Sequence, residues 1–335
     1  MQSSKNITII GTGAYGTVLA NVLTDNGHNV IMHGIENSQV NDINDNHINS
    51  AFFRDLIINE NIKATNDFPV AIEKAEVVIL SVPTFALDSA LDNILKYGKR
   101  KMSIINIAKG LDEENLDLLS NKIIKKLENK NVMKNFGALY GPSVAIEVIL
   151  RKPTCIMSCS KDKVFADFIA NLFSNEYFIV KSTTDIAGCE VSAALKNVIA
   201  IASGILQGYS ASDNARASLI TIGNAEIYKF AKVFGAEMTT FMNFATLGDL
   251  ILTCSSFKSR NFSLGMAIAE NNSAATALKY HKKTVEGVAS AKVAFKLMEK
   301  YKIDTPLFEI MYKILYNNLN PSNLINSFFK FATVV

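Results

Sequence analysis

Hydrophobic and polar positions follow two different patterns in the two halves of the chain. In the first half, short β-branched runs typical of buried strands alternate with longer segments of helical periodicity. The predicted strands are Asn6–Ile10, Asn29–His33, Val77–Ser81, Ser103–Ile107, Gly137–Tyr140, Pro153–Cys159 and Tyr177–Lys181, and the clearest helices are Ala14–Asn26, Asp112–Glu128 and Lys161–Phe173. This alternation predicts an α/β domain with a doubly wound parallel sheet and helices on both faces.

From about Asp185 onward, strand patterns stop and only helical patterns continue. The change predicts a boundary near residues 182–188, with a Rossmann-like α/β domain over residues 1–184 and an all-α domain over residues 185–335. A chain of 335 residues is long enough for two such domains, each with its own core.

Composition narrows the class of protein. Hydrophobic residues make up 49% of the chain and charged residues 19%, which is typical of a globular protein. The net charge of +3, without a dense basic cluster, argues against a nucleic-acid partner. The apolar run 191–206 is about as long as a short membrane span, but its internal Lys196 and Asn197 argue against a span.

Cysteine and histidine positions give no sign of a metal site. The four cysteines form no CxxC pair, and the four histidines form no HxxxH motif, so we expect no metal. Scattered cysteines favour a reducing, cytoplasmic location. The N-terminus enters a predicted strand at once, which leaves no room for a signal peptide.

A glycine motif follows the first predicted strand. Gly11, Gly13 and Gly16 form G-x-G-x-x-G between that strand and a helix, the context in which such a turn binds a dinucleotide pyrophosphate at the helix N-terminus. The alternative, an ordinary glycine turn, is the weaker interpretation in this context. Glu36, just past the second strand, is placed to bind the adenosine ribose hydroxyls and slightly favours NAD over NADP.

Lys196 lies in the apolar stretch 191–206. In a helix, its neighbours three and four residues away are Ser192, Ala193, Ile199 and Ala200, none of which can neutralise an ammonium. The common alternative is a lysine that lays its methylenes on apolar surface and reaches water with its head group. A buried lysine would instead need an acidic partner or lose its proton easily, which general acid–base catalysis requires.

Asp249 also stands among apolar residues and is our preferred partner for Lys196. The alternative is a helix-start capping pair with Thr246. Lys109 and Ser143 follow predicted strands, where residues face the ligand crevice of a parallel sheet. For Lys109 the alternative is a solvated loop lysine, whereas for Ser143 a helix cap is compatible with ligand binding, because free backbone N–H groups bind anions.

Ser259, Arg260 and Asn261 precede a helical pattern and form a plausible phosphate clamp. An exposed loop arginine is the equal alternative for Arg260 alone.

Taken together, the motifs resemble the bacterial type of NAD(P)-dependent glycerol-3-phosphate dehydrogenase over almost the whole chain. The matching segments are Gly11–Thr17, Ala108–Gly110, Gly141–Ser143, Leu195–Ala200, Asn214–Arg216, Leu247–Cys254, Ser259–Asn261 and Val285–Gly287. Tyr140 and Ile146 depart from the family, which usually has serine and a basic residue there. The resemblance implies reversible hydride transfer between NAD or NADP and dihydroxyacetone phosphate, giving sn-glycerol 3-phosphate for glycerophospholipid synthesis.

The resemblance also implies residue roles. Lys196 would be the proton donor and acceptor, with Asp249 as its charge partner and Thr253 and Asn197 ordering the site. Substrate contacts would come from Lys109, Gly141, Ser143, Lys196, Asp249, Ser259, Arg260 and Asn261. Cofactor contacts would come from Gly11, Gly13, Ala14, Tyr15, Gly16, Glu36, Lys109, Ala145, Arg260 and Glu286.

Two rival functions stay open at this point. One is a dehydrogenase of the same two-domain plan that acts on a ketopantoate-like acid, and the other is a non-catalytic dinucleotide sensor. The clamp at residues 259–261 weighs against the first, and the joint presence of Lys196, Asp249 and Thr253 weighs against the second. We expect a small-molecule substrate, no membrane span, and a homodimer as one alternative for the assembly.

Overall fold

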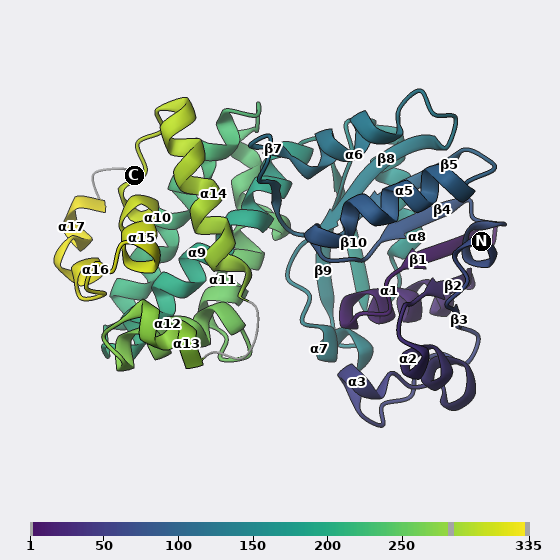
Figure 1. Ribbon diagram of the computed structural model, residues 1–335, viewed down its shortest axis with the longest axis horizontal. Coiled ribbons are helices and arrows are strands. Elements are labelled where there is room, and N and C mark those ends of the chain that lie inside the picture. The colour runs from purple at the N-terminus through teal and green to yellow at the C-terminus, as the bar shows by residue number, and fades with distance from the viewer. Residues whose placement is uncertain (1–2, 281–284, 332–335) are drawn as a thin grey trace. The chain divides into compact units, whose positions relative to one another are not determined.

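The computed structural model describes residues 3–280 and 285–331 and divides the chain into two compact units (Figure 1). The sheet unit comprises Met1–Ala108 and Leu119–Ile186, and the helical unit comprises Lys109–Leu118 and Ala187–Val335. The segment Lys109–Leu118, which the sequence pattern assigned to the first domain, therefore groups with the helical unit. This transfer matters for the site, because it brings Lys109 into the same unit as Lys196.

An eight-stranded sheet organises the first unit, in the order β10-β9-β8-β5-β4-β1-β2-β3. Neighbouring strands are parallel except β8 and β9, which are antiparallel. The strands are β1 Asn6–Ile10, β2 Asn29–His33, β3 Lys63–Thr65, β4 Val77–Leu80, β5 Met102–Asn106, β8 Met133–Tyr140, β9 Thr154–Cys159 and β10 Phe178–Thr183. The predicted Rossmann-like α/β fold is confirmed. The expectation of a sheet that is parallel throughout is wrong at β8 and β9, and the short edge strand β3 was missed by the sequence pattern.

Helices cover both faces of this sheet, as the alternation of β4 side chains shows. Val77 and Ile79 belong to the apolar cluster that includes helix α1, whereas Val78 and Leu80 belong to the cluster that includes helix α5. Successive side chains of a strand point to opposite faces, so a strand that is apolar at every position is buried on both. The helices and helical turns of this unit are α1 Ala14–Asp25, α2 Asn37–Asn41, η1 Asp42–Asn46, α3 Ser50–Phe53, α4 Phe68–Ile72, η2 Thr84–Ala86, α5 Leu87–Tyr97, α6 Leu119–Leu127, α7 Ala145–Ile149 and α8 Lys163–Phe173.

The helix expected over Asp112–Glu128 is wrong in its first part. Only Leu119–Leu127 is helical, and Leu111–Asp112 (β6) pairs with Asp117–Leu118 (β7) in an antiparallel ribbon. The Asp112 carboxylate accepts hydrogen bonds from the Glu114 backbone N–H at 3.2 Å and the Asn115 side chain at 2.6 Å. Such local bonds favour a turn over a helix.

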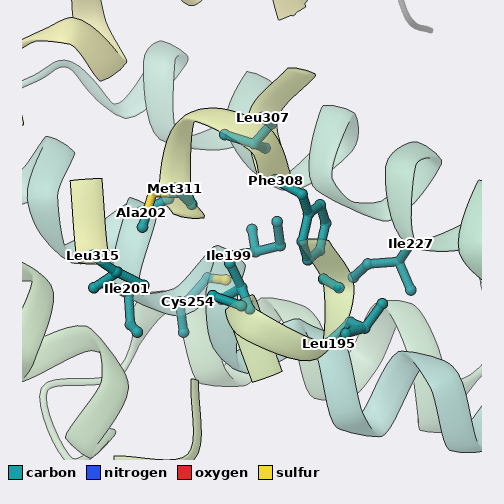
Figure 2. Close-up of a cluster of buried hydrophobic side chains, with 14 of the residues drawn as sticks. Leu195, Ile199, Ile201, Ala202, Ile227, Cys254, Leu307, Phe308, Met311 and Leu315 are labelled. Carbon is teal, nitrogen blue, oxygen red and sulfur yellow. The ribbon is translucent and has the colours of Figure 1, made fainter. Parts of the chain in front are cut away.

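Helix α9, Ile186–Gly208, forms the buried centre of the helical unit. Figure 2 shows Leu195 and Ile199 of α9 among Ile227, Phe308 and other apolar side chains from surrounding helices. The other elements are α10 Asp213–Lys232, η3 Met238–Met242, η4 Phe244–Gly248, α11 Asp249–Ser255, α12 Arg260–Glu270, α13 Ala274–Tyr280, α14 Glu286–Tyr301, α15 Pro306–Tyr316, α16 Asn323–Asn326 and α17 Phe328–Phe331. By length and composition α9 could cross a membrane, but its apolar window is fully buried in the unit, so it is weak evidence for a span.

Two glycines let α9 and α12 pack with their backbones almost in contact. A Cβ on Gly204 would lie 2.0 Å from the Phe262 carbonyl oxygen, and one on Gly265 would lie 2.1 Å from the Ile201 carbonyl oxygen. Neither position can hold a side chain without moving backbone. The close packing sets α12 against residues 201–204 of α9, five to eight residues beyond Lys196.

Candidate active site

Lys196 is buried in the helical unit, with only 5% of its surface exposed. Its Nζ lies 2.7 Å from Asp249 Oδ1 and donates a hydrogen bond of 2.6 Å to Thr253 Oγ1. The alternative in which the head group reaches water is therefore wrong, because the charge is held inside the unit by two residues of α11. The structure brings the predicted pair of Lys196 and Asp249 together.

Asp249 binds a second ammonium. Lys109 Nζ lies 2.9 Å from Asp249 Oδ2, so each carboxylate oxygen contacts one lysine. Thr253 Oγ1 donates to the Asp249 backbone carbonyl at 2.6 Å, which turns its oxygen lone pairs toward Lys196. The capping alternative with Thr246 is not what forms, because the Thr246 hydroxyl donates to the Thr240 carbonyl. The sequence pattern did not predict the Lys109–Asp249 ion pair.

Burial and charge move the pKa values of this cluster. Burial is the main cause that lowers the pKa of Lys196 to about 8, and Lys109 acts in the same direction, against the opposing attraction of Asp249. For Asp249, burial acts to raise the pKa, but the two ammonium groups outweigh it and hold the pKa below the usual range. Lys196 can therefore exchange a proton near neutral pH, beside a carboxylate that stays ionised.

A second set of polar residues begins at Asn197, the residue of α9 that follows Lys196. Asn197, which is 4% exposed, donates to Glu286 Oε2 at 3.1 Å, and Glu286 Oε1 lies 4.0 Å from an Arg260 nitrogen. Asn261 Oδ1 accepts the Gly287 backbone N–H at 2.9 Å. Glycine is needed at position 287 because a Cβ there would lie 2.7 Å from both the Asn197 carbonyl oxygen and Asn261 Oδ1.

Arg260 opens helix α12, and Ser259 caps it by accepting the Phe262 N–H at 3.3 Å. The Arg260 side chain is 54% exposed and Glu286 is 52% exposed, so their contact at 4.0 Å is a weak surface pair. The guanidinium is thus available to an anion at the N-terminus of an eleven-residue helix.

In the sheet unit, the glycine motif joins β1 to α1. Gly11 has φ +115°, and a Cβ there would lie 2.2 Å from the Ser81 carbonyl oxygen, while one on Gly16 would lie 2.6 Å from Ser81 Oγ. A Cβ on Gly13 would instead meet nothing within 4 Å, and Gly13 caps α1 without a side-chain hydrogen bond. Two glycines are required by packing and the third faces open space, which fits a pyrophosphate at the start of α1.

Other predicted residues of the sheet unit lie at strand ends. Gly141 has φ +150° directly after β8, and Ser143 Oγ donates to its carbonyl at 3.1 Å. Ala14 and Tyr15 begin α1, Ala145 begins α7, and the exposed Glu36 stands at the N-cap position of α2, after β2, without a side-chain capping hydrogen bond. Tyr140 is buried, and Asn106 donates to its hydroxyl at 3.3 Å.

Asn49 is a residue of the glycine turn that the sequence pattern did not single out. Its fully buried side chain donates to the Thr12 carbonyl and to Thr17 Oγ1, both at 2.9 Å. It lies more than thirty residues from the motif in sequence, and no periodicity marks it. No group of three or more His, Cys, Asp or Glu side chains in the described part of the chain is placed to hold a metal ion.

A Rossmann-like sheet with a dinucleotide-type glycine turn, followed by a helical unit with a buried lysine, defines the class of two-domain nicotinamide-dependent oxidoreductases. Comparison with known families identifies the family within this class. The pattern described as NAD-dependent glycerol-3-phosphate dehydrogenase N-terminus matches residues 6–166, and the one described as its C-terminus matches residues 185–326. The chain therefore belongs to the NAD-dependent glycerol-3-phosphate dehydrogenase family.

Individual relatives agree with this. A glycerol-3-phosphate dehydrogenase [NAD(P)+] of Mesoplasma florum is 56% identical over 333 residues, covering 99% of this chain and 100% of the relative. One from Staphylococcus saprophyticus is 37% identical over 94% of each chain. The crystal structure of glycerol-3-phosphate dehydrogenase from Coxiella burnetii has a TM-score of 0.88 and 29% identity, covering 98% of this chain and 99% of that one.

Proposed function

We propose that this chain is an NAD(P)-dependent glycerol-3-phosphate dehydrogenase that interconverts dihydroxyacetone phosphate and sn-glycerol 3-phosphate. The observation that carries the proposal is the buried Lys196 ammonium, held by Asp249 at 2.7 Å and Thr253 at 2.6 Å with a pKa lowered to about 8. A lysine with a pKa near the working pH suits proton transfer in both directions. The nicotinamide supplies or accepts the hydride when it is bound.

The residues of the cluster divide the proton chemistry among them. In the reducing direction, the Lys196 ammonium gives its proton to the oxygen at C2 of the substrate and remains as a neutral amine. Asp249 stabilises the charged form of Lys196, and Thr253 orients its Nζ. In the oxidising direction the neutral amine takes the proton back. Asn197 fixes Glu286, which faces Arg260.

We assign the substrate phosphate to the N-terminus of α12, where Arg260 and Asn261 follow the capping Ser259. Replacing Arg260 with alanine should raise KM for dihydroxyacetone phosphate about 10- to 100-fold, the effect of losing a charge-assisted contact to phosphate. Steady-state kinetics of Arg260→Ala and of Lys292→Ala, an exposed lysine of α14, would measure this. An Arg260→Ala enzyme with the KM of the Lys292→Ala control would contradict the phosphate assignment.

The glycine turn supports binding of either nicotinamide dinucleotide, and Glu36 past β2 favours NAD. Lys109, Gly141 and Ser143 as substrate contacts, and Tyr15, Ala145 and Glu286 as cofactor contacts, remain predictions. A supply of sn-glycerol 3-phosphate for glycerophospholipids, a cytoplasmic location and a homodimer belong to the same proposal. Size-exclusion chromatography with light scattering would test the dimer.

One assay tests the function itself. NADH and NADPH oxidation should be followed separately with dihydroxyacetone phosphate, with dihydroxyacetone and with ketopantoate. We expect turnover with the phosphorylated ketone, and at least ~100-fold lower kcat/KM without the phosphate, because substrate binding energy from a remote group is used at the reacting carbon. Faster turnover of ketopantoate would replace the proposal with its rival, and no turnover of any ketone would favour a dinucleotide sensor.

A further inference from the structure

The sheet unit contains a cavity of about 440 Å³ at the amino-terminal ends of its strands, whereas the glycine turn lies at the carboxyl end of β1. The cavity is lined by residues at the amino-terminal ends of four adjacent strands, β1, β4, β5 and β8, and by the first turns of α8. The glycine turn follows the carboxyl end of β1, so the two sites lie at opposite ends of the same strands. A volume of this size is within the range of small-molecule pockets.

Positive charge dominates the cavity wall. Four basic residues line it, Lys5, Arg100, Lys101 and Lys134, against two acidic ones, Glu76 and Asp162. Each basic residue lies just before or within the first two residues of a strand, so the ends of β1, β5 and β8 bring together positive charges that are far apart in sequence.

The two carboxylates are already bound within the protein. Glu76 Oε1 lies 3.0 Å from Lys5 Nζ, and Glu76 Oε2 accepts the Asn6 backbone N–H at 3.0 Å. Asp162 caps α8 by accepting the N–H groups of the next turn at 2.9 and 3.4 Å. The wall therefore keeps an excess of positive charge, because four basic residues line it against two carboxylates, and Glu76 attracts both Lys5 and Arg100.

Arg100, Lys101 and Lys134 are all exposed. Within residues 3–280 and 285–331, no ion pair of 4.0 Å or less holds any of the three, and Arg100 interacts with Glu76 through charge only. The mutual repulsion of the three cations across a concave surface would be relieved by a polyanion, and a concave wall of one sign focuses the field on such a ligand.

Two aromatic residues belong to the remaining wall, together with Val77, Ser103, Asn135 and Val164. Phe165 and Phe168 of α8 stack with their ring centroids 5.7 Å apart and their planes 15° apart, and both line the cavity. The adjoining Val164 is 77% exposed, which extends the apolar surface to the rim. An apolar, partly aromatic wall beside three exposed cations matches a ligand with a planar ring at one end and phosphates at the other.

We infer that this cavity is a second ligand site, which binds a nucleoside polyphosphate with its phosphates on Arg100, Lys101 and Lys134 and its base against the Phe165–Phe168 wall. The inference goes beyond the proposed function, because none of these residues belongs to the glycine turn or to the Lys196 cluster.

The test is calorimetric titration of the full chain with ATP, in magnesium-free buffer and with NADH at saturating concentration to occupy the glycine turn. We expect ATP to bind, and the triple variant Arg100→Ala, Lys101→Ala, Lys134→Ala to bind it at least ~10-fold more weakly, as loss of charge-assisted phosphate contacts requires. Lys63→Ala, Lys74→Ala, Lys130→Ala is the matched control, since it removes three exposed lysines of the same unit outside the cavity. Its ATP affinity should be that of the wild type.

Inorganic tripolyphosphate, which has the phosphates of ATP but no base, separates the contribution of the phosphates to binding from that of the base. We expect it to bind at least ~10-fold more weakly than ATP to the wild type, and Phe168→Leu to weaken ATP binding but not tripolyphosphate binding. Equal affinity for the two ligands would overturn the assignment of the base. No ATP binding under saturating NADH, or an equal loss in the triple variant and its control, would overturn the site. NADH affinity, measured on every variant, reports whether the sheet unit is still folded.

Discussion

The glycine turn of the sheet unit and the Lys196 cluster of the helical unit differ in their use of charged side chains. The turn contains no charged side chain and is held by neutral hydrogen bonds, such as Gly11 N–H to the His33 carbonyl at 2.8 Å and Asn49 to the Thr12 carbonyl at 2.9 Å. The cluster buries one carboxylate between two ammonium groups. The turn offers backbone N–H groups to a ligand, whereas the cluster buries Lys196 and Asp249 and leaves Lys109 partly exposed.

This difference teaches how each site can fail. A backbone site depends on space, because an added Cβ either strikes the protein or occupies the room of the ligand. A buried charged site depends on electrostatic balance, because the removal of one partner leaves the others buried and uncompensated. Substitutions that change volume should therefore damage the turn, and substitutions that change charge should damage the cluster.

The largest effect is expected for Lys196→Ala. Loss of the acid–base group should lower kcat by about 10²- to 10⁴-fold and leave the Kd for NADH within about twofold, because the turn is in the other unit. Stopped-flow or steady-state assays and a calorimetric titration with NADH measure the two quantities. Lys292→Ala is the control for loss of a lysine from the helical unit.

A Lys196→Ala enzyme with near-normal turnover would remove Lys196 from the proposed chemistry. A large loss of NADH affinity in Lys196→Ala would contradict the division of roles between the two sites, since it would show that the charged cluster also supports cofactor binding.

Gly11→Ala and Gly13→Ala sharpen the comparison within the turn. At Gly11, φ is +115° and the new Cβ would lie 2.2 Å from the Ser81 carbonyl oxygen, so we expect a loss of at least about 2 kcal/mol in the free energy of unfolding. At Gly13 the Cβ meets nothing within 4 Å, so stability should stay within about 0.5 kcal/mol while the Kd for NADH rises about tenfold or more. Urea unfolding and NADH titration separate the two effects.

Each glycine variant is the control for the other. Equal destabilisation of both would mean that the open space beside Gly13 is not available to an added methyl group. Unchanged NADH affinity in Gly13→Ala would contradict the placement of the pyrophosphate at the start of α1.

The sheet unit could be predicted from sequence to a large extent, because its signals are local. Alternating apolar runs set β1 and β2 at the residues expected, and the glycine motif needs only six consecutive residues. The short β3 was missed because three residues at a sheet edge carry almost no pattern. The β6–β7 ribbon was missed because Asp112 selects a turn where apolar spacing favoured a helix.

The Lys196 cluster could be predicted only in part, because its members come from separate segments. The conflict between a lysine and its apolar helix neighbours is visible in sequence, and it led to Asp249 as a partner. The second ammonium, Lys109, lies 140 positions from Asp249 and joins it through the segment that groups with the helical unit. Gly204 and Gly265, which set the packing of α9 on α12, have a role that only the folded distances reveal.

Glu226 tests whether ion pairing explains the pKa values of the cluster, because it is a buried carboxyl that forms no ion pair with the described residues, although the charge of Lys229 acts on it. Its two oxygens accept backbone N–H groups from Leu307 and Phe308 at 2.9 and 3.1 Å. Burial raises its pKa from 4.5 to about 7, although these two bonds favour the ionised form. The folded protein therefore binds the proton more tightly than the unfolded chain.

The sign of the pH dependence follows from that raised pKa. Its contribution to stability is fully present below pH 4.5 and is lost as pH rises through about 7, a change of up to about 3 kcal/mol. Glu226→Gln cannot titrate, so urea midpoints measured from pH 4.5 to 8 should fall more steeply for the wild type than for the variant. Parallel curves would show that Glu226 keeps an ordinary pKa and that burial alone does not shift a carboxyl here.

The smallest effect is expected where a single neutral hydrogen bond is removed from the charged cluster. Thr253→Val keeps the volume of the side chain but deletes the hydroxyl that accepts from Lys196 Nζ at 2.6 Å, while the ion pair with Asp249 at 2.7 Å remains. A typical hydrogen bond contributes about 1 kcal/mol, so kcat should fall about 3- to 10-fold, with Thr253→Ser close to the wild type. The pH dependence of kcat distinguishes a positioning role of the hydroxyl from simple loss of packing. The Thr253 hydroxyl accepts a hydrogen bond from the Lys196 ammonium and so favours the charged form of the lysine. The valine variant should therefore shift the part of the profile that depends on Lys196, which lies near pH 8. Removal of the hydroxyl should move that part of the profile to lower pH, and a serine variant that restores both the rate and the profile would assign the effect to the hydroxyl. A drop in rate with an unmoved profile would instead show that Asp249 and burial alone set the proton affinity of Lys196.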